Sequence, residues 1–223
     1  MEFQPPNAVL SIVQSTLLIV GALFPIVNPL SSAPIFLNLT QGYSTQVRSE
    51  LSRTIAINGF FLLIGSILIG THILDFFGIS LPVVQAAGGL VIISTGWSLL
   101  TERDDAPVRE TGASMEDMAK RAFYPLTLPL TVGPGSISVA ITLGANVPHG
   151  AALVRSFIAS VLGSALIGLS IYLCYRSAER IARLLGDVAM SVISRLSSFI
   201  LFCIGVQILW NGIKALLATQ HLK

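Results

Sequence analysis

Charged residues divide this chain into long uncharged runs, and these runs decide what it can fold into. No Asp, Glu, Lys or Arg occurs between Glu2 and Arg48, and five further runs extend to Asp75, Glu102, Arg155, Arg176 and Lys214. A helix needs about 20 apolar residues to cross a bilayer core about 30 Å thick. The runs therefore predict six transmembrane helices, at roughly 8–40, 54–74, 79–100, 122–147, 152–175 and 196–217.

The overall composition excludes the main classes of soluble protein. Hydrophobic residues make up 53% of the chain and charged residues only 11%, whereas a soluble domain carries about 25% charged residues. A soluble enzyme, a disordered regulator and a nucleic-acid-binding protein are set aside on this ground. We expect an all-α polytopic membrane protein whose residues 1–223 form a single membrane domain in the lipid bilayer.

The positions of the basic residues predict an orientation. Ten of the thirteen lysines and arginines fall in three segments, 40–53, 101–121 and 176–195, which we take as loops on one side of the membrane. Basic loops favour the cytoplasmic side. Both termini are therefore predicted to be periplasmic.

The chain also divides into two similar halves. Residues 8–100 are predicted to form a first three-helix repeat, 101–121 a charged cytoplasmic linker, and 122–217 a second three-helix repeat. Because each half has an odd number of helices, the second enters the membrane in the opposite sense. A shift of 105 residues superposes Pro29 on Pro134 and Ser31 on Ser136, which favours an inverted repeat.

Prolines interrupt the first helix of each half. Pro25, Pro29 and Pro34 in one half, and Pro125, Pro129 and Pro134 in the other, cannot all lie within one smooth helix, because proline lacks an N–H and clashes with the preceding turn. Broken helices at membrane depth expose half-helix N-termini, which hold substrates in secondary transporters. The predicted substrate-binding residues are Asn28, Pro29, Ser31, Ser32, Thr131, Gly133, Pro134, Gly135 and Ser136.

Two alternatives accompany this site. The Asn28 amide suits either group of a zwitterion, or it caps the broken helix. Gln85, Gln207 and Asn211 also lie within predicted helices, where hydrogen bonding between helices is the simpler explanation. We expect no metal site, no cofactor and no catalytic residues, since the pattern shows no metal-ligand spacing and no nucleophile paired with a base.

The stripe of small residues Ser160, Ser164 and Gly168 repeats every fourth position of the fifth helix. Such spacing marks a packing face. It suits an internal contact and a homo-oligomer equally, and both alternatives stay open.

The two proline motifs resemble a known family. FPIVNPLSSAPIFL near the start and AFYPLTLPLTVGPGSISVAI after the linker are similar to segments of the MarC family of bacterial inner-membrane proteins, and the resemblance covers nearly the whole chain. It implies a six-helix fold in the bacterial inner membrane. Through the related SnatA-type transporters it implies movement of small neutral amino acids such as glycine and alanine. The motif residues map onto Asn28, Pro29, Ser31 and the Gly133–Ser136 segment, whereas Ser197-Ser198 departs from an expected Met-Gly.

The leading functional hypothesis is a transporter of small neutral solutes that works by alternating access around the two broken helices. A passive channel for small solutes is the first alternative. A non-transporting membrane assembly or stress protein is the second. An enzyme is not expected.

Overall fold

The computed structural model describes residues 8–40, 43–101, 122–145 and 152–220. The regular elements in these ranges are helical: α1 (Ala8–Val27), α2 (Pro29–Leu39), α3 (Thr45–Phe76), α4 (Leu81–Thr101), η1 (Ala122–Thr131), α6 (Pro134–Ala145), α7 (Ala152–Arg176) and α8 (Ala178–Gln220). The predicted linker 101–121 lies outside the described residues except for Thr101, which ends α4.

The helices confirm the all-α membrane fold. Five stretches are long and apolar enough to cross a membrane: Val9–Leu37, Thr45–Phe76, Leu81–Ser98, Leu153–Arg176 and Ser198–Ala218. The fourth predicted helix is divided into η1 and the shorter apolar helix Pro134–Ala145, neither of which reaches the length of a span. The six-helix inverted repeat stays a prediction.

The outward faces of these helices are apolar. Leu18 on α1 is 70% exposed and Phe61 on α3 is 64% exposed. Apolar patches of this kind on a soluble surface would aggregate. In a bilayer they face acyl chains, so the exposed side chains agree with the membrane assignment.

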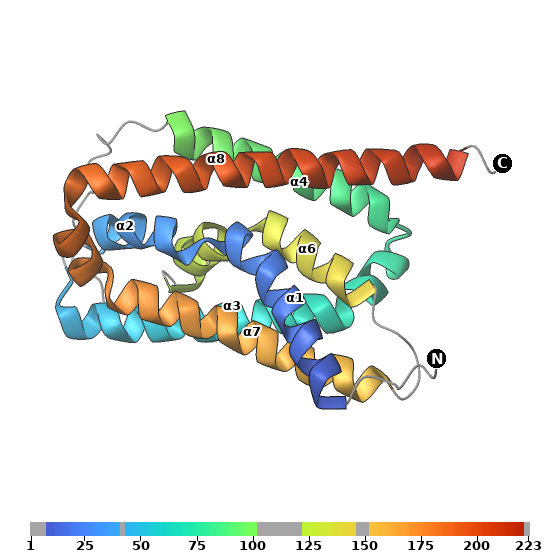
Figure 1. The fold of residues 1–223 in the computed structure, drawn as a ribbon, viewed down its shortest axis with the longest axis horizontal. Coiled ribbons are helices and arrows are strands. Elements are labelled where there is room, and N and C mark those ends of the chain that lie inside the picture. The colour runs from blue at the N-terminus through green and yellow to red at the C-terminus, as the bar shows by residue number, and fades with distance from the viewer. Residues whose placement is uncertain (1–7, 41–42, 102–121, 146–151, 221–223) are drawn as a thin grey trace, which may run out of the picture.

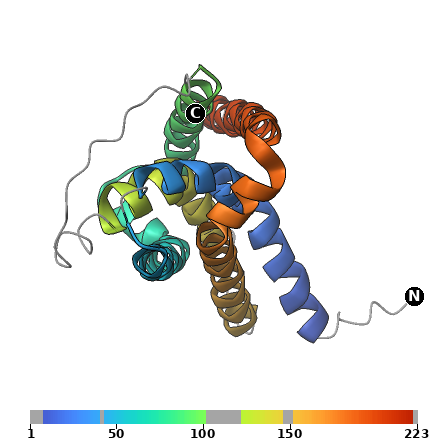
Figure 2. The same cartoon turned by 90° about the vertical axis from the view of Figure 1, so that its left-hand side faces the viewer.

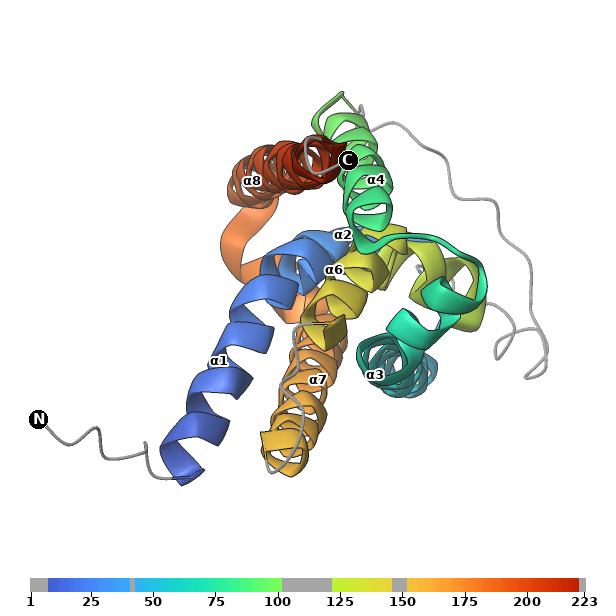
Figure 3. The ribbon, with the colours of Figure 1, turned by 90° about the vertical axis from the view of Figure 1, so that its right-hand side faces the viewer.

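The helices lie in three layers (Figures 2 and 3). α4 and α8 form one outer layer, α3 and α7 form the other, and α2, η1 and α6 lie between them. α1 slants out of the middle layer along α7. α1 begins and α8 ends at the same end of the molecule (Figure 1), while both interruptions lie near its centre. The broken helices are thus held between two pairs of long helices.

Glycines allow α4 and α8 to pack closely. Four glycines lie along this contact: Gly89, Gly96, Gly205 and Gly212. A Cβ atom on Gly96 would lie 2.8 Å from the backbone nitrogen of Phe202, and one on Gly205 would lie 2.7 Å from that of Ile93. Only glycine fits such an approach between backbones. We call these four residues the glycine seam.

The stripe on α7 packs inside the molecule. Ser160 and Ser164 are buried, and a Cβ atom on Gly168 would lie 3.2 Å from the carbonyl oxygen of Ala56 on α3. The stripe therefore makes internal contacts, and the homo-oligomer stays a prediction without support from these residues.

Most of the predicted loop 40–53 is helical, because α3 begins at Thr45. The assignment of 176–195 as a loop is also wrong. The segment is helical from Ala178 onward and is interrupted at Gly186, whose φ of 70° is left-handed. Its charges lie on a helix that begins outside the apolar run. Glu179 in the first turn pairs with Arg48 of α3, with 2.6 Å between Oε1 and Nη2, which ties the two helices together.

Candidate functional site

The first interruption is a single residue, Asn28, between α1 and α2. Its φ of 43° is left-handed, a conformation that Asn tolerates better than most residues. The N–H of Asn28 donates to the carbonyl of Phe24 at 2.8 Å, and its Oδ1 accepts from the N–H of Ser31 at 3.4 Å. Asn28 thus ends α1 and caps α2, and Pro29 takes the first helical position, where its missing N–H costs nothing.

The second interruption is longer and follows from two prolines. Tyr124 precedes Pro125 and Leu128 precedes Pro129, and both preceding residues have extended backbone. A proline disfavours the α conformation in the residue before it, which explains both breaks. η1 then ends at Thr131, and α6 begins at Pro134 after the two residues Val132 and Gly133.

Threonine hydroxyls satisfy carbonyls that the broken backbone leaves free. The Oγ1 of Thr127 donates to the carbonyl of Ala122, and the Oγ1 of Thr131 donates to that of Leu126, each at 2.6 Å. A buried carbonyl without a partner is costly in an apolar medium. The threonines therefore make unwound backbone tolerable at this depth.

Most of the predicted site residues are buried in protein. Pro29, Ser31, Ser32, Thr131, Gly135 and Ser136 are buried, Asn28 and Gly133 are half-buried, and Pro134 is exposed. The Ser136 hydroxyl donates to the carbonyl of Gly133 at 2.9 Å. The binding role of these nine residues stays a prediction.

Ser31 differs from its neighbours. Its hydroxyl is buried and has no hydrogen-bond partner among the described residues. It lies in the first turn of α2, one turn from the Asn28 cap. A hydroxyl without a partner in this position is available to a polar ligand or a water molecule.

A packed cluster joins the two interrupted segments to α7. The hydroxyls of Tyr175 on α7 and Thr131 on η1 lie 2.8 Å apart, and the ring of Tyr175 stacks on Phe36 of α2, with 4.6 Å between centroids and 10° between planes. All three side chains are buried. We call Phe36, Thr131 and Tyr175 the closing cluster, because it fills the core where α2, η1 and α7 meet.

A cavity of about 370 Å³ lies beside the interruptions, on the side where α1 begins and α6 ends. It is lined by Gly21, Ala22, Pro25, Ile26, Gln85, Val139, Thr142, Leu143, Ile204, Ile208 and Asn211. These residues come from the last two turns of α1 before its break, from the second half of α6, and from α4 and α8. None of the nine predicted site residues is among them.

The walls of the cavity are apolar apart from three neutral polar side chains, those of Gln85, Thr142 and Asn211. The Asn211 amide oxygen accepts from Nε2 of Gln207 at 3.0 Å, and the Thr142 hydroxyl donates to the carbonyl of Ser138 at 2.9 Å. A few polar groups in an apolar pocket are typical of small-molecule sites. None of the described residues that line this cavity is charged.

Sequence reasoning identified part of this arrangement and missed the rest. Gln85 and Asn211 stood out as polar residues inside apolar helices, and the structure places both at the cavity. Tyr175 gave no signal, because a Tyr beside Arg176 at a helix end resembles an interfacial anchor. Thr142 gave none either, since threonine is common in transmembrane helices.

These features define the class: a multi-pass helical membrane protein in which interrupted helices lie beside a cavity of solute size. Comparison with known proteins agrees with the class. The MarC family of integral membrane proteins matches residues 13–217, so the chain belongs to this family. No solved structure matches it.

Curated relatives support the assignment. The chain is 31% identical over 207 residues to proteins named "UPF0056 inner membrane protein MarC" from Salmonella paratyphi B and Salmonella typhimurium. A protein of the same name from Escherichia coli O1:K1 is also 31% identical. Each alignment covers 89% of this chain and 94% of the relative.

Proposed function

We propose that this protein transports small neutral solutes, with neutral amino acids as the class, by alternating access around its two interrupted helices. The cavity lined by Gln85, Thr142 and Asn211 is the observation that carries the proposal. It lies against both interrupted helices, so a rearrangement at Asn28 or Gly133 would change its shape. We assign this cavity a role in transport rather than in catalysis.

The chemistry of the lining supports a neutral solute. A strongly charged solute would need a countercharge in a site of low polarity, and the cavity offers amide and hydroxyl groups only. A small zwitterion satisfies its two groups with such amide and hydroxyl partners. The apolar part of the cavity wall suits the short side chain of a small neutral amino acid.

The asymmetry of the core supports alternating access. The cavity lies on the side where α1 begins, whereas the closing cluster of Phe36, Thr131 and Tyr175 fills the core on the other side of the breaks. We assign this arrangement to a state that is accessible from one side. Corresponding helices of the two halves also pack together, α3 on α7 and α4 on α8, as rocking of one repeat against the other would require.

We place the protein in the bacterial inner membrane. The names of its relatives support this location, and the basic segments support periplasmic termini. The cavity would then face the periplasm in the state described here.

Uptake of radiolabelled alanine by proteoliposomes tests the proposal. Thr142→Val removes a cavity hydroxyl and keeps the shape of the side chain, so we expect at least a fivefold loss of transport, the effect of about 1 kcal/mol from one hydrogen bond. Thr95→Val is the matched control, because Thr95 on α4 also donates to a carbonyl one turn back, that of Val91, at 2.9 Å. Thr95 does not line the cavity.

Equal losses in both variants would contradict the cavity assignment. Counterflow separates a carrier from a channel, since preloaded alanine accelerates tracer uptake only through a carrier. No uptake above empty vesicles, for alanine, glycine and serine alike, would favour a non-transporting membrane protein.

A further inference from the structure

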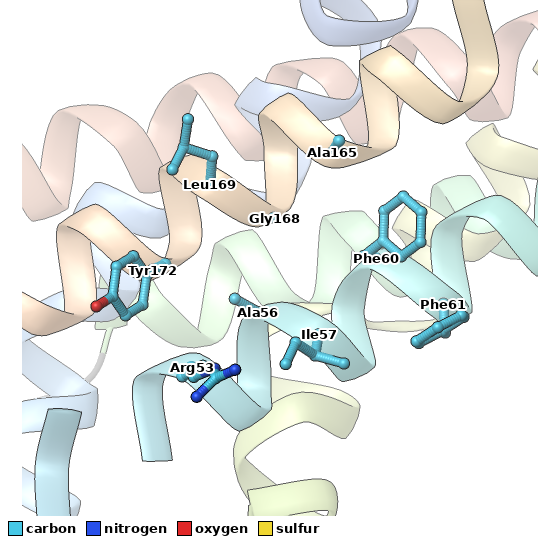
Figure 4. A pocket seen from close by; sticks show the side chains of 9 residues that line it. All are labelled: Arg53, Ala56, Ile57, Phe60, Phe61, Ala165, Gly168, Leu169 and Tyr172. Carbon is cyan, nitrogen blue, oxygen red and sulfur yellow. The ribbon is translucent and has the colours of Figure 1, made fainter. Parts of the chain in front are cut away.

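A second hollow lies outside the helix bundle, between α3 and α7. It has a volume of about 510 Å³ and is lined by Arg53, Ala56, Ile57, Phe60, Phe61, Ala165, Gly168, Leu169 and Tyr172. Figure 4 shows these residues along the two neighbouring helices, α3 and α7. We call it the α3–α7 groove. The cavity proposed for the solute shares no residue with it.

The groove is polar at one end only. Arg53 and Tyr172 lie together at one end, and Phe60, Phe61 and Ala165 lie toward the other (Figure 4). Between Arg53 and Phe61 the helix rises about 12 Å. Small residues keep the channel open, since Ala165 and Gly168 face it where larger side chains would fill it.

The polar end carries a second positive charge. Arg176 follows Tyr172 by one helical turn, its Nη1 donates to the Tyr172 hydroxyl, and its guanidinium lies 5.5 Å from the centre of the Tyr172 ring. Among the described residues, neither Arg53 nor Arg176 is in an ion pair. Glu179, the nearby acid of α8, is already paired with Arg48. The charge at this end is therefore available to an anion.

The two arginines also lie at one boundary of the membrane. Arg53 directly precedes the uncharged run of α3, and Arg176 directly follows that of α7. Because α3 and α7 run in opposite directions, these positions share one level. Headgroups lie at this level and acyl chains lie beside the uncharged runs.

We propose that the α3–α7 groove binds one phospholipid with an anionic headgroup. The phosphate lies between Arg53 and the Arg176–Tyr172 pair, and one acyl chain lies along Ile57, Phe61 and Leu169. Positive charge at one end and an apolar channel below it match the two parts of such a lipid. Basic pockets between transmembrane helices on the cytoplasmic side bind anionic headgroups in this way.

Native mass spectrometry of the full-length protein tests the proposal. The probes are phosphatidylglycerol and phosphatidylcholine with identical acyl chains, titrated into detergent-purified protein. We expect one phosphatidylglycerol to bind at least tenfold more tightly than phosphatidylcholine. Arg53→Gln and Arg176→Gln should each weaken phosphatidylglycerol about fivefold, the effect of one charge near a headgroup, and leave phosphatidylcholine unchanged.

A second pair of variants tests the apolar part. Ala165→Trp fills the groove and keeps both arginines, so it should reduce binding of the first phosphatidylglycerol at least fivefold. Leu166→Trp places the same ring on a neighbouring exposed position of α7 that does not line the groove, and should bind as the native protein does. Thermal unfolding of both variants checks that each is folded.

Equal retention of the two lipids, or unchanged phosphatidylglycerol binding in the Arg53→Gln Arg176→Gln double variant, would overturn the proposal. A lipid-free dimer cross-linked through Phe61→Cys and Leu169→Cys would also overturn it, because a second copy would then occupy the groove.

Discussion

Asn28 supports two helices with one side chain. It supplies the left-handed residue that ends α1 and the amide oxygen that caps α2. Substitutions at Asn28 separate these roles. Glycine keeps the left-handed backbone conformation but lacks the capping amide oxygen, whereas alanine disfavours the conformation and also lacks the amide oxygen.

We expect Asn28→Ala to lower the free energy of unfolding by about 2 kcal/mol, the sum of a lost cap and a positive φ. Asn28→Gly should cost only a few tenths of a kcal/mol. Thermal unfolding in detergent measures both. Equal destabilisation by the two substitutions would show that the backbone conformation is not what Asn28 provides.

For single residues, the sequence predicts where the two helices are interrupted, but it does not predict which side chains contact the interrupted segments. Prolines act through their own backbone, so the breaks predicted at the two proline motifs are found next to Pro29 and Pro134, where α2 and α6 begin. The contact between Tyr175 and Thr131 joins residues 44 positions apart. No local pattern specifies such a contact, because it depends on how the helices pack.

The glycine seam is the main contact between elements. A Cβ atom on Gly205 meets the backbone of α4 at 2.7 Å, and backbone cannot rotate away as a side chain can. In contrast, a Cβ atom on Gly65 of α3 meets no atom within 4 Å. These two glycines make a matched pair.

We expect Gly205→Ala to lower the free energy of unfolding by about 1–3 kcal/mol, as overpacking does. Gly65→Ala should leave stability unchanged or raise it by about 0.5–1 kcal/mol, because alanine favours the helix. Unfolding in sodium dodecyl sulfate, followed by circular dichroism, measures both. A neutral Gly205→Ala would mean that α4 and α8 are not held this closely.

Helices were predictable where hydrophobicity alone marks them, and not where charge interrupts it. The apolar runs gave α4 and α7 nearly to the residue. The charges of the segment 176–195 predict a loop, yet a charged segment forms a helix when it lies outside the bilayer core, and here it continues into α8. The charge of a segment indicates that it lies outside the bilayer core. It does not indicate whether its backbone is helical.

For the whole molecule, the orientation in the membrane is the next quantity to measure. The two ends of α3 provide the test, since Glu50 and Phe77 are both exposed and lie at its opposite ends. In a background with Cys174→Ser and Cys203→Ser, we expect Phe77→Cys to react with a membrane-impermeant maleimide in spheroplasts. Glu50→Cys should react only after the membrane is permeabilised. The reverse pattern would place the termini and the cavity in contact with the cytoplasm.

The glycine seam also constrains the order in which the molecule is assembled. Gly96 of α4 and Gly205 of α8 are separated by roughly a hundred residues, which take about 5–20 s to synthesise. During that time α8 has not been made, so Gly89 and Gly96 of α4 lack the helix that they contact in the folded protein. The outer layer is therefore complete only when α8 has been made, and a chain truncated before α8 would display an unpaired glycine face to the proteases that remove incomplete membrane proteins.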